Sequence, residues 1–451
     1  MSGSRDVQPA GALDGVRVLD FTWSVAGPVL TRNLAILGAE ILKVEWPAHA
    51  DPMRSAFYAA DATYRGFNNG PFFADLNVGK KSLTVDVRSP EGAAVVTRLL
   101  EQCDLVVESF SSRVFERWGF GYEQLSAINP SIVYVSISGF GHSGPNRDWD
   151  TWGPTAQAYN GLTHQSGLPG REPAGWGWSY MDLAAGYTAT VATIAALLSA
   201  RATGVGQYVD ISQIESGIAL NGAAILDATV NERAFSGTDV PIGNRSVVKD
   251  ASQNGGTQSG YRGDEGVPYG IYPTKGGGYF DYCAVTACSD EQWFALRRAM
   301  GDPPWSARGD LDNLSGRIES QDEIDEEIAS WSMGFEKYEL MEYLQGCGVA
   351  AGAVQSAEDK MESDPQLFSS NLWPYLTHPE IGRHRFQGVP FSMSPSPTRV
   401  EERWPILGSD TASILEGVLN MSAEEVADLE ARGITWPAGM GRDVDYGREL
   451  W

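Results

Sequence analysis

The sequence of 451 residues is short of basic side chains, and of lysine above all. It contains 33 Lys and Arg against 58 Asp and Glu, which gives a formal net charge of −25, and seven of the bases are lysines. Nucleic acids and anionic membranes are bound by clustered Lys and Arg. We therefore expect neither as a partner, and an anionic ligand must be bound by local basic residues.

Cysteine, histidine and long apolar runs are scarce as well. The four cysteines form no CxxC pair, and the closest histidines, in HPEIGRH at 378–384, have a spacing typical of a loop rather than of a metal site. No run reaches the roughly 20 apolar residues of a membrane span. The first 15 residues contain no apolar run of a secretory signal. We expect a reduced, cytoplasmic protein without a bound metal.

What is present is an alternation of strand-like and helix-like segments over the first 140 residues. Short β-branched runs predict buried strands, and the segments between them predict helices; in Ser89-Pro90-Glu91, Ser89 has the character of an N-cap and Pro90 suits the first helical position. This alternation predicts an α/β fold with a mostly parallel sheet. The expected strands are 16–22, 39–45, 81–87, 105–110 and 132–140, and the expected helices are 28–38 and 89–103.

The remainder of the chain predicts more helix. A helix is expected from Asp182 to about Arg201, a strand at 208–212 and one helix over 213–232. Composition then shifts to Gly, Ser and Asn between about 235 and 278, which indicates loops and a candidate boundary. Further helices are expected at 290–301, 322–334, 338–348 and 422–433.

Familiar nucleotide and hydrolase motifs do not fit. VGKKS at 78–82 has Ala74 where a P-loop needs glycine, and GVGQYV at 204–209 lacks the third glycine of a dinucleotide fingerprint. There is no GxSxG elbow for a catalytic serine. Carboxylates are left as the candidates for chemistry.

Asp182 stands out among them, in the stretch GWGWSYMDLAAGYTATVATIAAL that begins at Gly175. A lone acid precedes a helix of small and apolar residues, behind several aromatic ones. Helix capping is one interpretation, because Asp is among the best N-caps. The other is a nucleophile tuned by the helix dipole and by limited access of water. The residues alone leave both open.

Nine motifs in order, from about Leu13 to Gly433, resemble the class III CoA-transferase family, which includes formyl-CoA and carnitine CoA-transferases and acyl-CoA racemases. The resemblance makes Asp182 the catalytic aspartate. It implies reversible CoA transfer between an acyl-CoA and a carboxylic acid, through an aspartyl anhydride and an aspartyl-CoA thioester. The motifs are LDGVRVLDFTWSVAGP, LAILGAEILKVEWP, DPMR, KKSLTVDVRSPEG, CDLVVESF, ERWGFGYEQLSAINPSIVYVSISGFG, ARATGVGQYVDIS, GNR, and HPEIG with PFSMSPSP.

The resemblance also implies a CoA site. Two positions depart from the family pattern: Trp46 replaces an arginine that often contacts the CoA nucleotide, and Ser109 replaces the usual asparagine. Phosphate binding is then expected to rest on two arginines, with Lys80 as a helper. The positions that match CoA contacts are Val25, Ala26, Arg88, Ser109, Phe110, Ser111 and Arg117.

The acyl pocket is predicted from the residues around Asp182. Trp176, Trp178 and Tyr180 form either a dry wall that protects the intermediates from water or ordinary core packing. Gly255 and Gly256 open the glycine-rich segment 255–278, which is either the loop that this family closes over the intermediate or a surface turn cluster. The aromatic residues before Asp182 favour an apolar or bulky acyl group. CoA would be transferred between two acids or between the two carboxylates of one diacid.

Two other functions stay open. A racemase would pair Asp182 with a histidine, but Trp152 stands at that position in DWDTWGPTAQAYNG. A non-catalytic acyl-CoA-binding protein would keep the pocket without the chemistry.

The resemblance implies a large Rossmann-like α/β domain from 1–229 and 351–451, with a smaller α+β domain inserted at 230–350. It also implies an interlocked homodimer. Acyl-CoA and a small carboxylic acid are then the expected partners, as substrates, with no permanently bound cofactor.

Overall fold

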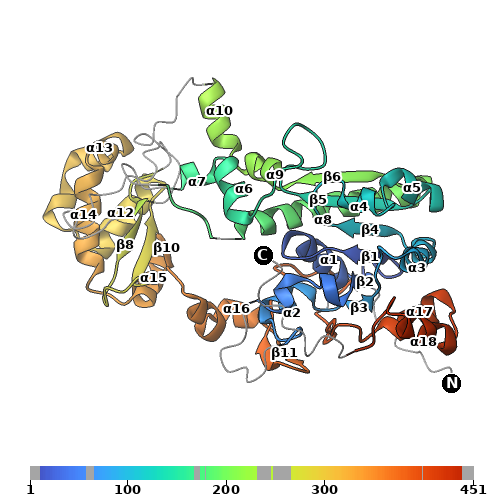
Figure 1. The fold of residues 1–451 in the computed structure, drawn as a ribbon. Coiled ribbons are helices and arrows are strands. Elements are labelled where there is room, and N and C mark those ends of the chain that lie inside the picture. The colour runs from blue at the N-terminus through green and yellow to red at the C-terminus, as the bar shows by residue number, and fades with distance from the viewer. Residues whose placement is uncertain are drawn as a thin grey trace, which may run out of the picture. The chain divides into compact units, whose positions relative to one another are not determined.

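The computed structural model describes residues 11–56, 66–166, 173–177, 179–230, 245–246, 266–398 and 400–438. The chain forms two compact units, whose elements are labelled in Figure 1. The first comprises Met1–Asn160, Gly177–Leu220 and Ser370–Trp451, and the second comprises Gly161–Trp176 and Asn221–Ser369. The domain boundaries at 230 and 350 stay a prediction.

The first unit is built on a six-stranded sheet in the order β3-β2-β1-β4-β5-β6, and every neighbouring pair is parallel. This confirms the predicted α/β class and the five predicted N-terminal strands, each shorter than the run that suggested it. The strands are β1 (Arg17–Phe21), β2 (Glu40–Glu45), β3 (Lys81–Thr84), β4 (Leu105–Glu108), β5 (Val133–Ser138) and β6 (Tyr208–Ser212).

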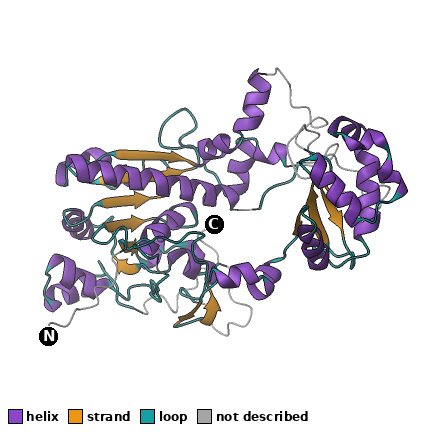
Figure 2. Ribbon diagram, turned by 180° about the vertical axis from the view of Figure 1, so that it is seen from behind, coloured by secondary structure: helices purple, strands orange, loops and turns teal. Residues whose placement is uncertain are grey.

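Helices cover this sheet on both faces. In Figure 2 the helices are purple and the strands orange. Ser89 caps α3 as predicted, because its hydroxyl accepts the N–H of Gly92 and Pro90 is the first helical residue. The helices are α1 (Ala26–Ile36), α2 (Pro71–Asn77), α3 (Pro90–Leu100), α4 (Val114–Arg117), α5 (Tyr122–Ile128), α6 (Gly153–Tyr159), α8 (Tyr180–Thr203), α9 (Gln213–Leu220), α17 (Thr411–Leu419) and α18 (Ala423–Ala431), with two short 3₁₀ turns at Pro47–His49 and Pro52–Arg54.

The core of this unit consists of two hydrophobic layers separated by the sheet. Successive strand residues point to opposite faces, so Val18 packs in the layer beneath α1 and α8, whereas Leu19 packs in the layer beneath α3 and α17. Both side chains have no exposed surface. A strand buried on both faces explains why the sequence shows continuous apolar runs rather than alternation.

A small hairpin completes the first unit. Its strands β11 (Tyr375–His378) and β12 (Gly382–Arg385) enclose the predicted HPEIGRH turn, in which His378 Nδ1 accepts the backbone N–H of Glu380. Among the described residues, no group of three or more His, Cys, Asp or Glu is placed to hold a metal ion.

The second unit has its own core. Its sheet, in the order β10-β9-β8-β7, packs against helices around the buried Trp293. The single helix expected over 213–232 is wrong: the chain turns at Asn221, so that α9 belongs to the first unit and α10 (Gly222–Val230) to the second. The remaining elements are α7 (Leu162–Gln165), β7 (Arg245–Ser246), β8 (Tyr269–Pro273), β9 (Tyr282–Thr286), α12 (Asp290–Ala299), two 3₁₀ turns at Pro304–Ala307 and Gly309–Asp312, α13 (Leu314–Glu319), α14 (Gln321–Ser332), α15 (Lys337–Gly346), β10 (Ala350–Ala353), a π-helical turn at Asp359–Ser363 and α16 (Pro365–Ser369).

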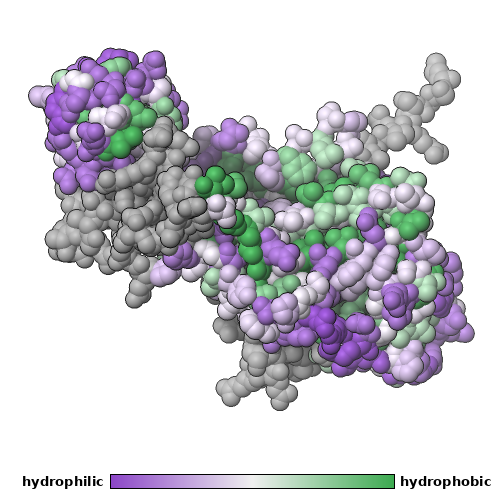
Figure 3. All heavy atoms as spheres, turned by 90° about the horizontal axis from the view of Figure 1, so that it is seen from above, coloured by the Kyte–Doolittle hydropathy of each residue, from purple (hydrophilic) through white to green (hydrophobic). Residues whose placement is uncertain are grey.

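Helix α8 presents apolar side chains at the surface of the first unit. Among the described residues, α8 is the one helix that is long and apolar enough to cross a membrane. Of its most apolar stretch, 39% is buried. Tyr187, Val191 and Leu198 are exposed along it. Figure 3 shows hydrophobic residues, in green, at the surface of the molecule.

Candidate active site

A cavity of about 750 Å³ lies at the carboxyl ends of the parallel strands of the first unit. The chain builds the sheet outward from β1 to β3 and then returns to place β4 on the other side of β1. Loops at such a reversal diverge and leave a crevice. The cavity walls accordingly come from the residues that follow β1 (Trp23–Ala26), β4 (Ser109–Ser111) and β5 (Gly139).

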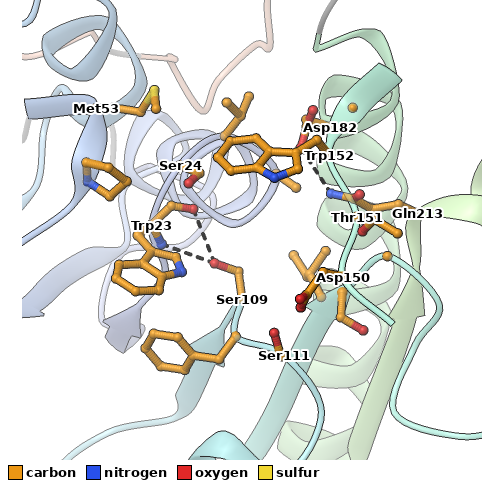
Figure 4. A pocket seen from close by; sticks show the side chains of 18 of the residues that line it. Trp23, Ser24, Met53, Ser109, Ser111, Asp150, Thr151, Trp152, Asp182 and Gln213 are labelled. Atoms are coloured by element: carbon orange, nitrogen blue, oxygen red, sulfur yellow. Dashed lines mark hydrogen bonds between the residues drawn. The ribbon is translucent and has the colours of Figure 1, made fainter. Parts of the chain in front are cut away.

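The turn after β1 is fixed by its neighbours, as Figure 4 shows. The Trp23 N–H donates to Ser109 Oγ at 3.1 Å, and Ser109 Oγ–H donates back to the Trp23 carbonyl at 3.2 Å. Ser24 has a φ of 62° and donates its N–H to Asp51 Oδ1 at 3.1 Å. These bonds hold the turn of β1 against the loop of β4, so this wall of the cavity is preorganised.

Asp182 reaches the cavity from the first turn of α8. The helix begins at Tyr180 with Ser179 at its N-cap, so Asp182 is the third helical residue and not the cap. Burial raises the pKa of Asp182 to about 6, against the opposing effect of a hydrogen bond from Gln213. Gln213 Nε2 donates to Asp182 Oδ1 at 3.1 Å (Figure 4).

Helix α8 lies close against α1, and this contact positions Asp182. Gly186, one turn after Asp182, has no room for a side chain, because an added Cβ would lie 2.7 Å from Val29 Cγ1 and 2.8 Å from the Ala26 carbonyl oxygen. Ala26 itself lines the cavity. The small residues of the sequence therefore bring the catalytic candidate next to the turn of β1.

The loop between β5 and α6 supplies the outer wall with Arg147, Trp149, Asp150, Thr151 and Trp152. Trp149 and Trp152 are more than half exposed, and Trp152 lines the same cavity as Asp182. The aromatic residues that line the cavity thus come from this loop, from the turn after β1 (Trp23) and from the loop after β4 (Phe110). Tyr180, two residues before Asp182, is not one of the residues that line the cavity, and Trp176 belongs to the second unit; their expected part in a wall against water stays a prediction.

Six of the expected site residues surround this one cavity: Val25, Ala26, Ser109, Phe110, Ser111 and Asp182. The side chain of Val25 packs with Val29 and Leu76, so its backbone is the part available to a ligand. The expected positions Trp178, Gly255 and Gly256 lie outside the described residues. The roles of all these residues stay predictions.

Arg88 and Arg117 lie outside the cavity but close to a row of aromatic rings that leads away from it. Ring centroids are 5.3 Å apart for Trp23 and Phe110, 5.0 Å for Phe110 and Trp118, and 5.8 Å for Trp118 and Trp46. The Arg88 guanidinium lies 5.2 Å from the centroid of Trp46 and pairs with Asp86. Arg117 ends α4 and is exposed.

The expectation that Lys80 helps to bind phosphate is wrong. Its side chain has no exposed surface, and Nζ lies 3.2 Å from Asp20 Oδ2 and donates to Thr31 Oγ1 and Asn77 Oδ1. A buried ammonium with these partners has no contact with an incoming ligand.

Sequence reasoning also missed Gln213, Trp23, Arg147 and Trp149 as cavity residues, and it named Trp152 only as the residue at the position of a racemase histidine. A usable signal was present for Gln213. It is a polar residue directly after the predicted strand 208–212, and ligands bind at the carboxyl ends of parallel strands. Arg147 and Trp149 carry no such signal, because only the course of the loop brings them to the cavity.

The comparisons with known proteins agree with one another. Residues 13–411 match the family model described as CoA-transferase family III. The chain is 32% identical over 436 residues to a succinyl-CoA–D-citramalate CoA-transferase of Chloroflexus aurantiacus, covering 96% of this chain and 100% of that protein. It is 31% identical over 433 residues to a formyl-CoA:oxalate CoA-transferase of Rhodopseudomonas palustris, covering 94% and 98% of the two chains.

Solved structures show the same fold. A CAIB/BAIF family protein from Brucella suis superposes with a TM-score of 0.76 at 23% identity and covers 91% of this chain and 100% of that one. Rv3272 from M. tuberculosis gives a TM-score of 0.73, also at 23% identity, covering 90% and 99%. The chain therefore belongs to the family III CoA-transferases and is an enzyme of that class.

Proposed function

We propose that the protein transfers coenzyme A reversibly between an acyl-CoA thioester and a carboxylic acid, with Asp182 as the covalent nucleophile. The observation that carries the proposal is the carboxylate of Asp182, which opens into the cavity at the strand reversal and is bonded by the neutral amide of Gln213. The relatives named as CoA-transferases for succinyl-CoA and formyl-CoA support the reaction class.

Four substitutions at carbonyl carbons complete one exchange. An oxygen of Asp182 attacks the acyl carbon of the donor thioester, and the CoA thiolate leaves, which gives a mixed anhydride. The thiolate then attacks Asp182 Cγ, the donor acid leaves, and an aspartyl-CoA thioester forms. The acceptor carboxylate attacks Cγ and releases the thiolate again. The thiolate attacks the acceptor acyl carbon, so the new acyl-CoA departs and the Asp182 carboxylate is restored. Covalent catalysis of this kind divides one difficult exchange into easier steps.

The environment of Asp182 suits a nucleophile. A carboxylate with a pKa of about 6 is mostly ionised at pH 7.5 and is more basic, and so more nucleophilic, than an ordinary aspartate. Among the described cavity residues Arg147 is the basic one. Burial thus keeps Asp182 reactive while it limits the access of water, which would hydrolyse both intermediates.

We propose that CoA binds along the row of aromatic rings formed by Trp23, Phe110, Trp118 and Trp46. Its thiol end would lie in the cavity at Val25 and Ala26, and its adenine would lie near Phe110. Arg88 and Arg117 would bind phosphates at the solvent edge. Their guanidinium groups would supply local positive charge, although the net charge of the protein is negative. The bulky walls formed by Trp23, Trp149 and Trp152 favour an apolar or bulky acyl group, transferred between two acids or between two carboxylates of one diacid. CoA is then a substrate rather than a resident cofactor.

We further propose a cytoplasmic homodimer in which the exposed apolar stripe of α8, formed by Tyr187, Val191 and Leu198, is covered by the second copy. An exposed apolar stripe of this kind marks an interaction surface. Trp176, Trp178 and Tyr180 would add to the wall that excludes water, and the loop at Gly255 and Gly256 would close over the intermediates. Light scattering at several protein concentrations measures the oligomeric state.

The test of the reaction is intact and peptide mass spectrometry after incubation with a panel of acyl-CoAs, with hydroxylamine and borohydride trapping. We expect a modification at Asp182 that is absent from Asp182→Ala. An unmodified Asp182 combined with incorporation of α-deuterium into the acyl-CoA would contradict the proposal and support the racemase. Binding without exchange or epimerisation would support a non-catalytic acyl-CoA-binding protein.

A further inference from the structure

We propose that Gln213 is a catalytic residue: its amide N–H stabilises the oxyanion that forms on Asp182 Oδ1 each time Asp182 Cγ is attacked. This inference rests on the proposed function, since it concerns the steps at Cγ. Its structural basis is the hydrogen bond of 3.1 Å from Gln213 Nε2 to Asp182 Oδ1, at the edge of the cavity that both residues line.

Gln213 is held by its backbone on two sides. It is the first residue of α9 and directly follows Ser212, which pairs with Ser138 of β5. The next residue, Ile214, donates its N–H to the carbonyl of Gly139 at 3.0 Å. Because Gly139 lines the cavity, the start of α9 is fixed to the cavity wall.

The same helix is pressed against the residue that precedes Asp182. An added Cβ on Gly217 would lie 1.8 Å from Asn160 Nδ2 and 2.7 Å from Met181 Cε, and Asn160 Nδ2 itself lies 3.2 Å from Met181 Sδ. Gly217 is one turn after Gln213, and Met181 is next to Asp182. The packing of α9 on α8 therefore sets the distance between the amide and the carboxylate before any substrate binds.

The side chain of Gln213 is itself only 8% exposed. A buried amide gains from a hydrogen bond to a charged partner and loses when that partner is removed. An amide is also neutral over the working pH range, so it donates a bond without forming the ion pair that would quench a nucleophile. This combination distinguishes Gln213 from a lysine or arginine at the same position.

The hydrogen bond assigns different parts to the two oxygens of Asp182. Because the amide faces Oδ1, Oδ2 is the oxygen placed to attack the donor thioester, and Oδ1 remains the carbonyl oxygen of the anhydride. When the thiolate attacks Cγ, the electron pair of that carbonyl moves onto Oδ1, where the amide already donates. The same holds when the acceptor carboxylate attacks the aspartyl-CoA thioester. In the first and last steps the charge develops on the substrate acyl oxygen, which lies elsewhere.

Gln213 should therefore act in two of the four steps. Removing one preorganised donor from an oxyanion site lowers kcat by roughly 100- to 1,000-fold. The loss should fall on the steps at Cγ and spare the first attack, which makes the role separable from a general loss of activity.

The variant that tests this is Gln213→Met, which keeps the volume and length of the side chain and removes the donor. In rapid-quench experiments with acyl-CoA we expect the burst of free CoA thiol from anhydride formation to persist. Appearance of the CoA adduct on Asp182, followed by intact mass, should slow by about 100-fold. In addition, loss of the hydrogen bond should move the acid limb of the pH–rate profile to higher pH, because that bond lowers the pKa of Asp182.

Gln207→Met is the matched control, since Gln207 is an exposed glutamine just before β6 that does not line the cavity. It should exchange CoA at the wild-type rate. Should Gln213→Met fold poorly, Gln213→Asn keeps an amide but withdraws it from Oδ1, and the same selective slowing is expected. A Gln213→Met enzyme within threefold of wild type at the Cγ steps, or one slowed equally in the thiol burst, overturns the inference. Failure of the proposed function itself would look different, because wild-type Asp182 would then carry no adduct.

Discussion

Asp182 and Asp20 are two carboxylates of the first unit that are largely shielded from solvent. Asp20 is paired with a cation, whereas Asp182 is hydrogen-bonded by a neutral amide. Asp20 has no exposed surface, lies 3.2 Å from Lys80 Nζ, and accepts hydrogen bonds from Thr22 and Thr31. Asp182 has the neutral amide of Gln213. Burial would raise the pKa of Asp20, but the charges of Lys80 and Lys43 and the Thr22 hydrogen bonds outweigh it and keep that pKa below its ordinary value. Burial dominates at Asp182, whose pKa rises to about 6.

The difference separates a carboxylate held by ion pairs from one whose basicity is raised by burial. Ion pairs stabilise the charge of Asp20 and so reduce its basicity, and Glu45 is held in the same way by Arg54, whose Nη2 lies 2.6 Å from Glu45 Oε2. Asp182 keeps its basicity because a donor without charge orients it. Within the described residues, Asp182 thus combines a place at the cavity with a neutral partner, which is what the proposed nucleophile requires.

The largest effect is expected from Asp182→Asn, which removes the nucleophile and preserves the volume of the side chain. Exchange should fall by at least roughly 10⁴-fold, as for loss of a covalent nucleophile in other enzymes. The protein should become more stable at pH 7.5, on the order of 1–3 kcal/mol, because ionised Asp182 is destabilising in its buried site. Exchange assays and urea unfolding measure the two effects. A variant that retains a tenth of the activity would contradict the assignment of Asp182.

Removing the cation beside Asp20 should damage the fold instead. Lys80→Met leaves Asp20 buried without its ion pair, which destabilises by about 3–5 kcal/mol. The neighbouring Lys81→Met is the control: Lys81 pairs with Glu40, and both side chains are about 30% exposed, so the loss should stay below about 1 kcal/mol. Urea unfolding of both variants checks this. Equal losses would show that the buried pair has no special weight.

Acid should separate the two carboxylates in one experiment. Activity should fall about tenfold per pH unit below pH 6, as Asp182 becomes protonated. The lowered pKa values of Asp20 and Glu45 give stability that is present above their ordinary values of 3.8 and 4.5 and is lost only as the pH falls through the lower folded-state values. At pH 5 the protein should thus be folded but retain only about a tenth of its activity. Circular dichroism and exchange rates across pH 4.5–8 report both, and joint loss of fold and activity would count against the comparison.

The smallest effect concerns the contact that positions Asp182. Gly186→Ala inserts a Cβ at 2.7 Å from Val29 Cγ1, so α8 must move away from α1, with an expected loss of about 1–3 kcal/mol and lower activity. Gly417→Ala in α17 is the control, because its Cβ would meet nothing within 4 Å. That variant should gain about 0.5–1 kcal/mol from helix propensity. Thermal unfolding that moves both variants in the same direction would refute the steric argument.

Much of the fold was predictable because its signals are local. Strands buried on both faces require continuous β-branched and apolar runs, as in 132–140, and the two residues Ser89-Pro90 mark the start of α3. The break between α9 and α10 was missed, although Asn221-Gly222 is a dipeptide typical of turns, because apolar residues resume directly after it. The chain divides there between two units, which is a property of long-range contacts.

The sequence by itself determined the α/β class, the family and Asp182 as the candidate nucleophile, since each depends on residue types in a fixed order along the chain. Only the tertiary structure decided which residues surround Asp182. Gln213 reaches it across 31 positions through the packing of α9 on α8, and Trp152 lines the same cavity through the course of a loop. The tertiary structure also shows that Lys80 does not belong to the site, because its ammonium group pairs with the buried Asp20. The sequence does not reveal whether a lysine faces solvent or a buried aspartate. Burial and charge pairing act through space, so only the tertiary structure fixes the opposite pKa shifts of Asp182 and Asp20.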